Sequence, residues 1–206
     1  MIFESDSLVV LETKIRTCEL CALADTRKNA VPGSGNDDSK IMFIGEGPGH
    51  HENEKGLPFV GAAGKLLDEL LQGIDLRRED VYITNIVKCR PPQNRDPKPE
   101  EIEFCNAYLE RQIDLIDPKV IVTLGRFSMA RWFPGARISD IHGVPKRFGL
   151  RIVVPMFHPA AALHNPKWRP MLHDDFSRLP GFIAKMNAED EDNNGPQMVP
   201  EQLNLF

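Results

Sequence analysis

The chain has 206 residues, of which 41% are hydrophobic, and its formal net charge at pH 7 is −5. This length and composition predict one well-cored domain, and no apolar run is long enough to span a membrane. The first residues lack the basic and apolar regions of a secretory signal, so we expect a cytoplasmic protein. Residues 187–206 hold five acidic residues and no basic ones, and the rest of the chain has 25 of each, so no overall basic surface of the kind common in nucleic-acid-binding proteins is predicted.

Short continuous apolar runs indicate buried strands, and longer runs with helical periodicity indicate helices. Strands are expected near residues 40–44, 81–87, 120–124 and 151–156. Helices are expected over residues 7–17, 62–72, 99–116 and 169–186, with a short helix after Gly125. Strands that alternate with helices require right-handed crossovers, so the pattern predicts an α/β fold with a parallel sheet of at least four strands, in one domain over residues 1–186.

A glycine-rich turn, Gly45-Glu-Gly-Pro-Gly49, follows the first predicted strand directly. Open α/β sheets bind ligands at the carboxyl ends of their strands, and this turn would lie there. The turn does not match the common nucleotide-binding motifs. His50 stands at the sixth position of the dinucleotide fingerprint, and Leu66 follows Gly64-Lys65 where a P-loop needs a hydroxyl group.

Polar residues stand at the ends of three predicted strands. Glu46 follows the first strand, Asn85 lies in the second, and His158 follows the fourth, while Phe59 lies on the loop after the first. A lone histidine is most often structural. Because the carboxyl ends of parallel strands meet at one edge of the sheet, these side chains are predicted to form one site.

The four cysteines of the chain are Cys18, Cys21, Cys89 and Cys105. Disulfides are not expected in an intracellular protein, whereas four thiolates suit zinc or an iron–sulfur cluster. The first pair has the tight C-x2-C spacing of metal ligands, but 15 residues separate the second pair, and spacing alone favours neither metal. Four unconnected buried thiols are the remaining alternative.

Four ordered motifs and the cysteine spacing together resemble the family 4 uracil-DNA glycosylases. The motifs are Gly45-Glu-Gly-Pro-Gly49, Gly56-Leu-Pro-Phe-Val-Gly-Ala-Ala-Gly64, Thr84-Asn-Ile-Val-Lys-Cys-Arg-Pro-Pro92 and His158-Pro-Ala-Ala-Ala-Leu163, and the resemblance covers about residues 10–183. It implies a three-layer α/β/α sandwich with a central four-stranded parallel sheet and a [4Fe–4S] cluster on the four cysteines. It also implies an enzyme that removes uracil from double- or single-stranded DNA and acts as a monomer.

The resemblance assigns the base pocket to residues whose chemistry suits uracil. Phe59 would stack on the ring, and the amide of Asn85 would match the N3–H donor and O4 acceptor of uracil. Backbone N–H groups at Gly45 and Gly47 would also bind the base. Better-known uracil glycosylases of another family carry Asp in place of Gly47 and an aromatic residue in place of Gly49, so thymine must be excluded differently here.

The resemblance also assigns the chemistry of bond cleavage. His158 would donate to O2 of uracil, where negative charge builds as the bond to the sugar breaks. Glu46 would position or deprotonate the attacking water. No lysine stands out as a Schiff-base nucleophile, so we expect a monofunctional enzyme that leaves an abasic site. Leu163, after the His158 motif, is a candidate wedge that fills the vacated place in the base stack.

Three other functions compete with this reading. An iron–sulfur redox or electron-transfer protein would explain the cysteines but not Phe59, Asn85 and His158. A zinc-stabilised nucleotide-binding module is disfavoured by the incomplete phosphate motifs. A DNA-crosslinking relative uses a histidine in an inserted basic loop, and His142 lies nearby, but no basic insertion precedes it, which favours a hydrolase.

The C-terminal segment, residues 187–206, is predicted to be a disordered acidic tail because it carries little apolar surface. Its end is different, with two leucines and a phenylalanine in the last five residues. This pattern resembles the short motif by which bacterial repair and replication proteins bind the sliding clamp. The residues that would make the contact are Gln202, Leu203, Leu205 and Phe206.

Overall fold

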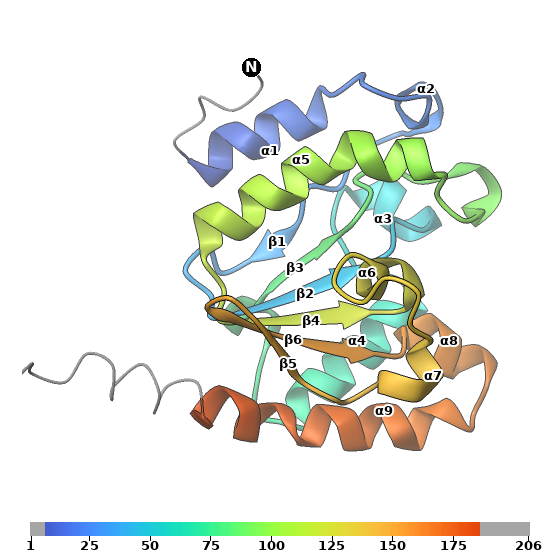
Figure 1. Ribbon diagram of the computed structural model, residues 1–206. Helices are drawn as coiled ribbons and strands as arrows, with labels where there is room; N and C mark the ends of the chain where they lie inside the picture. Colours follow the sequence, from blue (N-terminus) through green and yellow to red (C-terminus); the bar gives the residue numbers. More distant parts are fainter. Residues whose placement is uncertain (1–6, 186–206) are drawn as a thin grey trace, which may run out of the picture.

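The computed structural model describes residues 7–185. One sheet with the strand order β1-β3-β2-β4-β6-β5 forms the centre of the molecule. Helices α1 (Leu8–Arg16) and α5 (Pro99–Ile116) cover one face of the sheet, and α4 (Ala62–Gln72) and α9 (Trp168–Ser177) cover the other (Figure 1). The predicted three-layer α/β/α arrangement is therefore confirmed.

Four central strands run parallel to one another, as predicted. They are β3 (Tyr82–Asn85), β2 (Ile41–Gly45), β4 (Val120–Leu124) and β6 (Arg151–Met156). Two short antiparallel strands, β1 (Ser34–Gly35) and β5 (Lys146–Phe148), extend the sheet at its edges. Sequence analysis did not predict these two, because a Ser-Gly pair and an exposed basic pair carry no apolar signal.

The long helices begin and end within a few residues of their predicted bounds. The predicted final helix is interrupted, because α9 ends at Ser177 and helical structure resumes over residues 179–185. Several helices of four to six residues were not predicted, since so short a segment shows no clear periodicity. The remaining elements are α2 (Leu23–Thr26), α3 (His50–Lys55), α6 (Arg126–Ala130), α7 (Ile138–Ile141), α8 (Pro159–His164), and the 3-10 turns η1 (Arg78–Asp80) and η2 (Pro92–Asn94).

Strand β2 shows why the central strands are apolar throughout. Phe43 belongs to the core beneath α4 and α9, where its ring stacks on Phe176 with centroids 5.7 Å apart. Met42 and Ile44 belong to the core beneath α1 and α5. Burial of each such side chain stabilises the fold by about 1.5–3 kcal/mol relative to exposure. Both faces of the strand are therefore fixed by packing.

The parallel arrangement directs the carboxyl ends of β2, β3, β4 and β6 to one edge of the sheet (Figure 1). Among residues 7–185, no helix has both the length and the apolar character needed to cross a membrane. The predicted acidic tail and the candidate clamp-binding residues Gln202, Leu203, Leu205 and Phe206 lie outside the described residues.

Candidate active site at the carboxyl edge of the sheet

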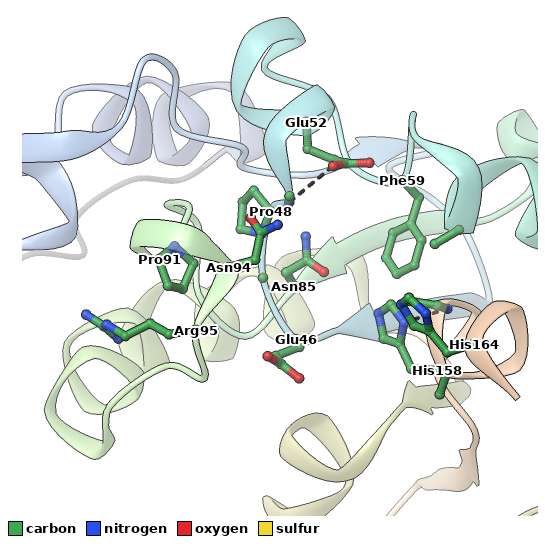
Figure 2. Close-up of a pocket in the computed structure, with 15 residues that line it drawn as sticks. Glu46, Pro48, Glu52, Phe59, Asn85, Pro91, Asn94, Arg95, His158 and His164 are labelled. Atoms are coloured by element: carbon green, nitrogen blue, oxygen red, sulfur yellow. Dashed lines mark hydrogen bonds between the residues drawn. The ribbon is translucent and has the colours of Figure 1, made fainter.

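A cavity of about 490 Å³ opens at this edge, and five of the predicted site residues line it. They are Glu46, Gly47, Phe59, Asn85 and His158. Figure 2 shows the side chains of Glu46, Phe59, Asn85 and His158 converging from separate loops and strand ends. The volume lies within the usual range for small-molecule pockets. The structure thus brings together the residues that the sequence placed at separate strand ends.

Asn85 is the last residue of β3, and only 1% of its surface is exposed. Its side-chain oxygen Oδ1 is buried and has no hydrogen-bond partner within the described part of the chain. A buried amide oxygen without a partner costs about 1–3 kcal/mol, so this atom is suited to a donor on a ligand. Gly45 lies behind it, where a Cβ atom would be 2.4 Å from Oδ1 and 2.7 Å from Cζ of Phe59. Gly45 therefore supports the pocket without lining it.

Phe59 is held in a left-handed backbone conformation, with φ at 51°. Arg78 donates to the carbonyl oxygens of Pro58, over 3.0 Å, and of Phe59 itself. Close packing against Gly64 also fixes this turn, because a Cβ atom there would be 1.8 Å from the Phe59 oxygen. The buried Phe59 ring lies beside that of His158, with centroids 5.5 Å apart and planes 24° from parallel. The two rings are therefore stacked on each other at the side of the cavity.

His158 follows β6, and its hydrogen bond identifies its tautomer. Nδ1 accepts a hydrogen bond from the backbone N–H of Ala160 over 3.1 Å. Burial lowers the pKa of His158 to about 4, so the ring is neutral at pH 7. In a neutral imidazole only one nitrogen carries hydrogen, so Nε2 is the donor here. The site therefore presents an uncharged N–H group.

Glu46 is the carboxylate that follows β2. Burial raises its pKa above the usual range, Asp96 adds to this effect, and Arg126 opposes it. Asp96 and Arg126 form an ion pair with each other beside the site. A carboxylate with a raised pKa accepts a proton more readily than an ordinary glutamate does, which suits a general base.

Glu52 on α3 is a site residue that sequence analysis did not assign. One of its oxygens accepts from the backbone N–H of Gly49 over 3.1 Å (Figure 2). The other accepts from the backbone N–H groups of Val60 and Gly61 over 2.9 Å. This single carboxylate joins the two glycine-rich loops of the cavity. The sequence signal for this role is that Glu52 stands three residues after Gly49, the spacing between the N-cap and N3 positions at the start of a helix. Other lining residues that the sequence reading missed include Asn94, Arg95 and His164.

Leu163 lies on α8, beside rather than within the cavity. Its neighbours Ala161 and His164 line the cavity, whereas Leu163 is 45% exposed. An exposed leucine next to the mouth of a pocket is positioned to contact a large substrate.

The four cysteines come together in a second cavity, which Arg27 and Lys88 also line. Cys18 and Cys21 follow α1, Cys89 follows β3, and Cys105 lies within α5. All four thiols are free. Within residues 7–185, no group of three or more His, Cys, Asp or Glu side chains has the spacing needed to hold a metal ion. A zinc ion, for comparison, binds cysteine sulfur at about 2.3 Å.

The surroundings of the cysteines suit a negatively charged sulfur-ligated group. Burial raises the pKa of Cys105 to about 12 and also raises the pKa of Cys21 and Cys89. Thiolates here therefore need a positive partner, as metal binding provides. Arg27 donates from Nη1 to the sulfur of Cys89 over 3.3 Å and from Nη2 to the carbonyl of Arg16 over 3.2 Å. The four cysteines and their surroundings thus fit a thiolate-bound metal group.

The fold and the cavity define a protein of the uracil DNA glycosylase superfamily, whose family model matches residues 32–178. The chain is 48% identical over 189 residues to a type-4 uracil-DNA glycosylase of Archaeoglobus fulgidus, covering 87% of this chain and 95% of that protein. It is 49% identical over 184 residues to the type-4 uracil-DNA glycosylase of Saccharolobus solfataricus, covering 84% of this chain and 85% of that protein. It is 42% identical over 190 residues to the type-4 uracil-DNA glycosylase of Thermotoga maritima, covering 90% of this chain and 99% of that protein. The chain belongs to the type-4 uracil-DNA glycosylases.

Proposed function

We propose that this protein removes uracil from DNA by hydrolysing the N-glycosidic bond, leaving an abasic site for base excision repair. Its family membership supports the reaction. The observation that carries the residue-level assignment is the buried amide oxygen of Asn85, which has no hydrogen-bond partner among residues 7–185 and lies at the cavity that Phe59 and His158 also line. The amide supplies a recognition group for one base edge.

Base recognition begins when the target nucleotide leaves the stack and enters the cavity. Phe59 stacks on the ring. Oδ1 of Asn85 accepts from N3–H of uracil, and the amide nitrogen donates to O4. Cytosine presents the opposite donor and acceptor pattern, so its entry leaves a buried amide mispaired. Sites of this kind discriminate by about 10⁴-fold or more.

Cleavage of the bond between C1′ and N1 moves negative charge onto the uracil ring. The neutral His158 donates from Nε2 to O2 of the leaving base, and the backbone N–H group of Gly47, which lines the cavity, assists in binding. Preorganised donors of this kind commonly supply the largest catalytic contribution. Glu46 orients the attacking water, takes its proton, and stabilises the positive charge on the sugar.

The cavity chemistry supports a simple hydrolase. Among the described residues that line the cavity there is no lysine to form a Schiff base, which supports a monofunctional enzyme. The Nδ1 atom of His142 lies 2.7 Å from the buried carboxylate of Asp175, and its ring packs on Phe157, 4.7 Å between centroids. This engagement disfavours a crosslinking role for His142. Leu163 is the wedge that enters the vacated base site.

Cys18, Cys21, Cys89 and Cys105 hold a [4Fe–4S] cluster in this proposal. When bound, the cluster supplies a structural tie between the segment after α1, the segment after β3, and α5. Arg27 offsets its negative charge through the hydrogen bond to Cys89. Uracil recognition and hydrolysis are carried out by the residues of the other cavity.

The proposal extends to partners. The enzyme acts as a cytoplasmic monomer on double- or single-stranded DNA that contains uracil. The C-terminal residues Gln202, Leu203, Leu205 and Phe206 bind the sliding clamp, with Leu205 and Phe206 in an apolar pocket.

The proposed reaction is tested with oligonucleotides that carry one uracil, cytosine or thymine at the same position. After incubation and hot alkali, strand breaks at uracil alone are expected. An electron-transfer protein gives no breaks, and a crosslinking protein gives an adduct that survives denaturation. With Asn85→Ala, we expect excision of uracil to fall steeply while the protein remains folded. Wild-type excision by this variant contradicts the pocket assignment.

A further inference from the structure

Lys88 is a lysine in the interior of the domain, with only 1% of its surface exposed. Its ammonium group donates to three oxygens, those of the Thr84 hydroxyl at 2.7 Å, the Asn85 backbone carbonyl at 2.7 Å, and the Gln112 side chain at 2.6 Å. An ammonium group has three hydrogens, so each finds an acceptor. Burial of so polar a group is costly unless it is fully hydrogen-bonded, as it is here.

The acceptors around Lys88 are themselves held in place. The Thr84 hydroxyl donates to the Pro32 carbonyl over 2.7 Å. The Gln112 amide donates to the same carbonyl over 2.9 Å and to the Tyr82 hydroxyl over 3.2 Å. The network therefore joins β3, the segment before β1, and helix α5. A fully connected polar network of this kind rigidifies the elements that it joins.

This hydrogen-bond network ends at Asn85, the residue proposed to recognise the base. The Asn85 side-chain oxygen has no hydrogen bond within the described residues, so packing and the backbone of Asn85 determine where it lies. The backbone carbonyl of Asn85 is held by Lys88. Lys88 also lines the cysteine cavity beside Cys89, and Gln112 lies two turns beyond Cys105 on α5. The ammonium group thus links the cysteine site to the base pocket.

We propose that Lys88 is a positioning residue for uracil recognition. Its three hydrogen bonds fix the end of β3 against α5, and this aligns the Asn85 amide before uracil enters. The cysteine site, through α5 and Cys89, keeps the network in register, so damage to that site is transmitted to the pocket. This inference rests on the proposed role of Asn85. Lys88 itself touches neither the base nor the DNA.

The test uses full-length, metal-loaded protein with Lys88→Met, which keeps an unbranched side chain one atom shorter and removes its three donors. We expect the single-turnover rate on uracil to fall about 10-fold or more, since small displacements of a binding group are costly. The inhibition constant of free uracil should rise by a similar factor. Affinity for duplex DNA with an abasic site should stay within about 2-fold of wild type.

Gln112→Met provides a second variant that loses one acceptor, and it should shift the rate and the uracil inhibition constant in the same direction by less. Tyr82→Phe removes only an outer hydrogen bond of the network and does not touch the ammonium group, so it should shift both quantities least of the three variants. A merely structural Lys88 would lower iron content and melting temperature but leave both quantities normal in the folded fraction. Unchanged values for Lys88→Met, or for Gln112→Met if the first variant fails to fold, overturn the inference.

Asn85→Ala in the same assay separates this inference from the proposed function. If it leaves the inhibition constant of free uracil unchanged, the assignment of Asn85 as the base reader is wrong. If Asn85→Ala weakens inhibition by uracil and Lys88→Met does not, only the role of Lys88 is wrong.

Discussion

At the scale of single residues, the pocket depends on two glycines, which have no side chain, as much as on the side chains that line it. Gly45 leaves space that the Asn85 amide and the Phe59 ring occupy together. Gly64 allows the Phe59 carbonyl to lie against the start of α4. These two glycines allow the Asn85 amide and the Phe59 ring to lie close together at the end of a buried strand.

Gly45→Ala tests this dependence on space. The added methyl group would lie 2.4 Å from Oδ1 of Asn85 and 2.7 Å from the Phe59 ring, so both must move. We expect excision of uracil to fall on the order of 10²-fold, with a loss of about 1–3 kcal/mol in the free energy of unfolding from overpacking. Gly181→Ala is the control, because within residues 7–185 nothing beyond its chain neighbours and its own helix backbone lies within 4 Å of the added methyl group. Similar activities of the two variants in a single-turnover assay would contradict the packing argument.

The pH dependence of excision should report Glu46 rather than His158. The pKa of Glu46 is raised by burial, whereas that of His158 is lowered to about 4, so His158 stays neutral while Glu46 titrates. If ionised Glu46 is the base, the rate falls as pH decreases through a pKa above the usual glutamate range. Glu46→Gln should be slower and should lose this acidic limb. A single-turnover pH profile in which the variant retains the limb would assign it to another group.

At the scale of elements, α8 carries two neighbouring side chains with different surroundings. His164 faces the cavity, and the neighbouring Leu163 is exposed beside it. A wedge is needed only when a base must be extracted from a stack. We therefore predict that α8 has a role on duplex DNA that it lacks on a single strand.

Leu163→Ala should reduce excision from duplex DNA more than from single-stranded DNA, by about 10-fold or more in the ratio of the two rates. Leu150→Ala is the matched control, since Leu150 is 75% exposed and precedes β6 at the opposite edge of the sheet. Rates on both substrates can be compared with one uracil oligonucleotide, with and without its complement. Equal loss on the two substrates rejects the wedge.

The sequence was sufficient to predict the elements that long apolar patterns define. The four parallel strands and helices α1, α4 and α5 follow from such patterns, and parallel topology brings Glu46, Asn85 and His158 to one edge. Glu52 could not be assigned in this way, because its carboxylate acts on the N–H groups of Gly49, Val60 and Gly61, which approach one another only after folding. The same holds for the Lys88 network, whose lysine would be expected on the surface.

At the scale of the whole molecule, the cysteine site joins segments that are distant in the sequence. Cys18 and Cys21 lie in the N-terminal part of the chain, and Cys89 and Cys105 flank the segment that enters α5. The segments around these cysteines should lose order together when a ligand is removed, because metal binding and folding are coupled.

Cys105→Ser should give poorly folded or insoluble protein with little iron, whereas wild type should be brown, with broad visible absorbance. Iron and zinc content measured by elemental analysis after anaerobic preparation distinguishes the two metals. Colourless wild-type protein with stoichiometric zinc would overturn the cluster assignment, and a well-folded, active Cys105→Ser variant would show that this cysteine is not a ligand.

Removal of the residues after Pro200 should abolish binding to the sliding clamp of the same organism. A short anchor of this type is expected to bind with a dissociation constant on the order of micromolar, or about −8 kcal/mol. Calorimetry of the full-length and shortened proteins measures this difference, and excision on short oligonucleotides serves as the control because it needs no clamp. Equal binding by both proteins, or by neither, would contradict the assignment.

The two edge strands that sequence analysis did not predict have a consequence for behaviour at high concentration. An exposed sheet edge can pair with the edge of another molecule and so start aggregation. Here β1 is only two residues long, and β5 carries the exposed basic residues Lys146 and Arg147. Outer strands that are short or charged provide few backbone groups for pairing with the sheet edge of a second molecule. The apolar strands between them therefore stay shielded from intermolecular pairing.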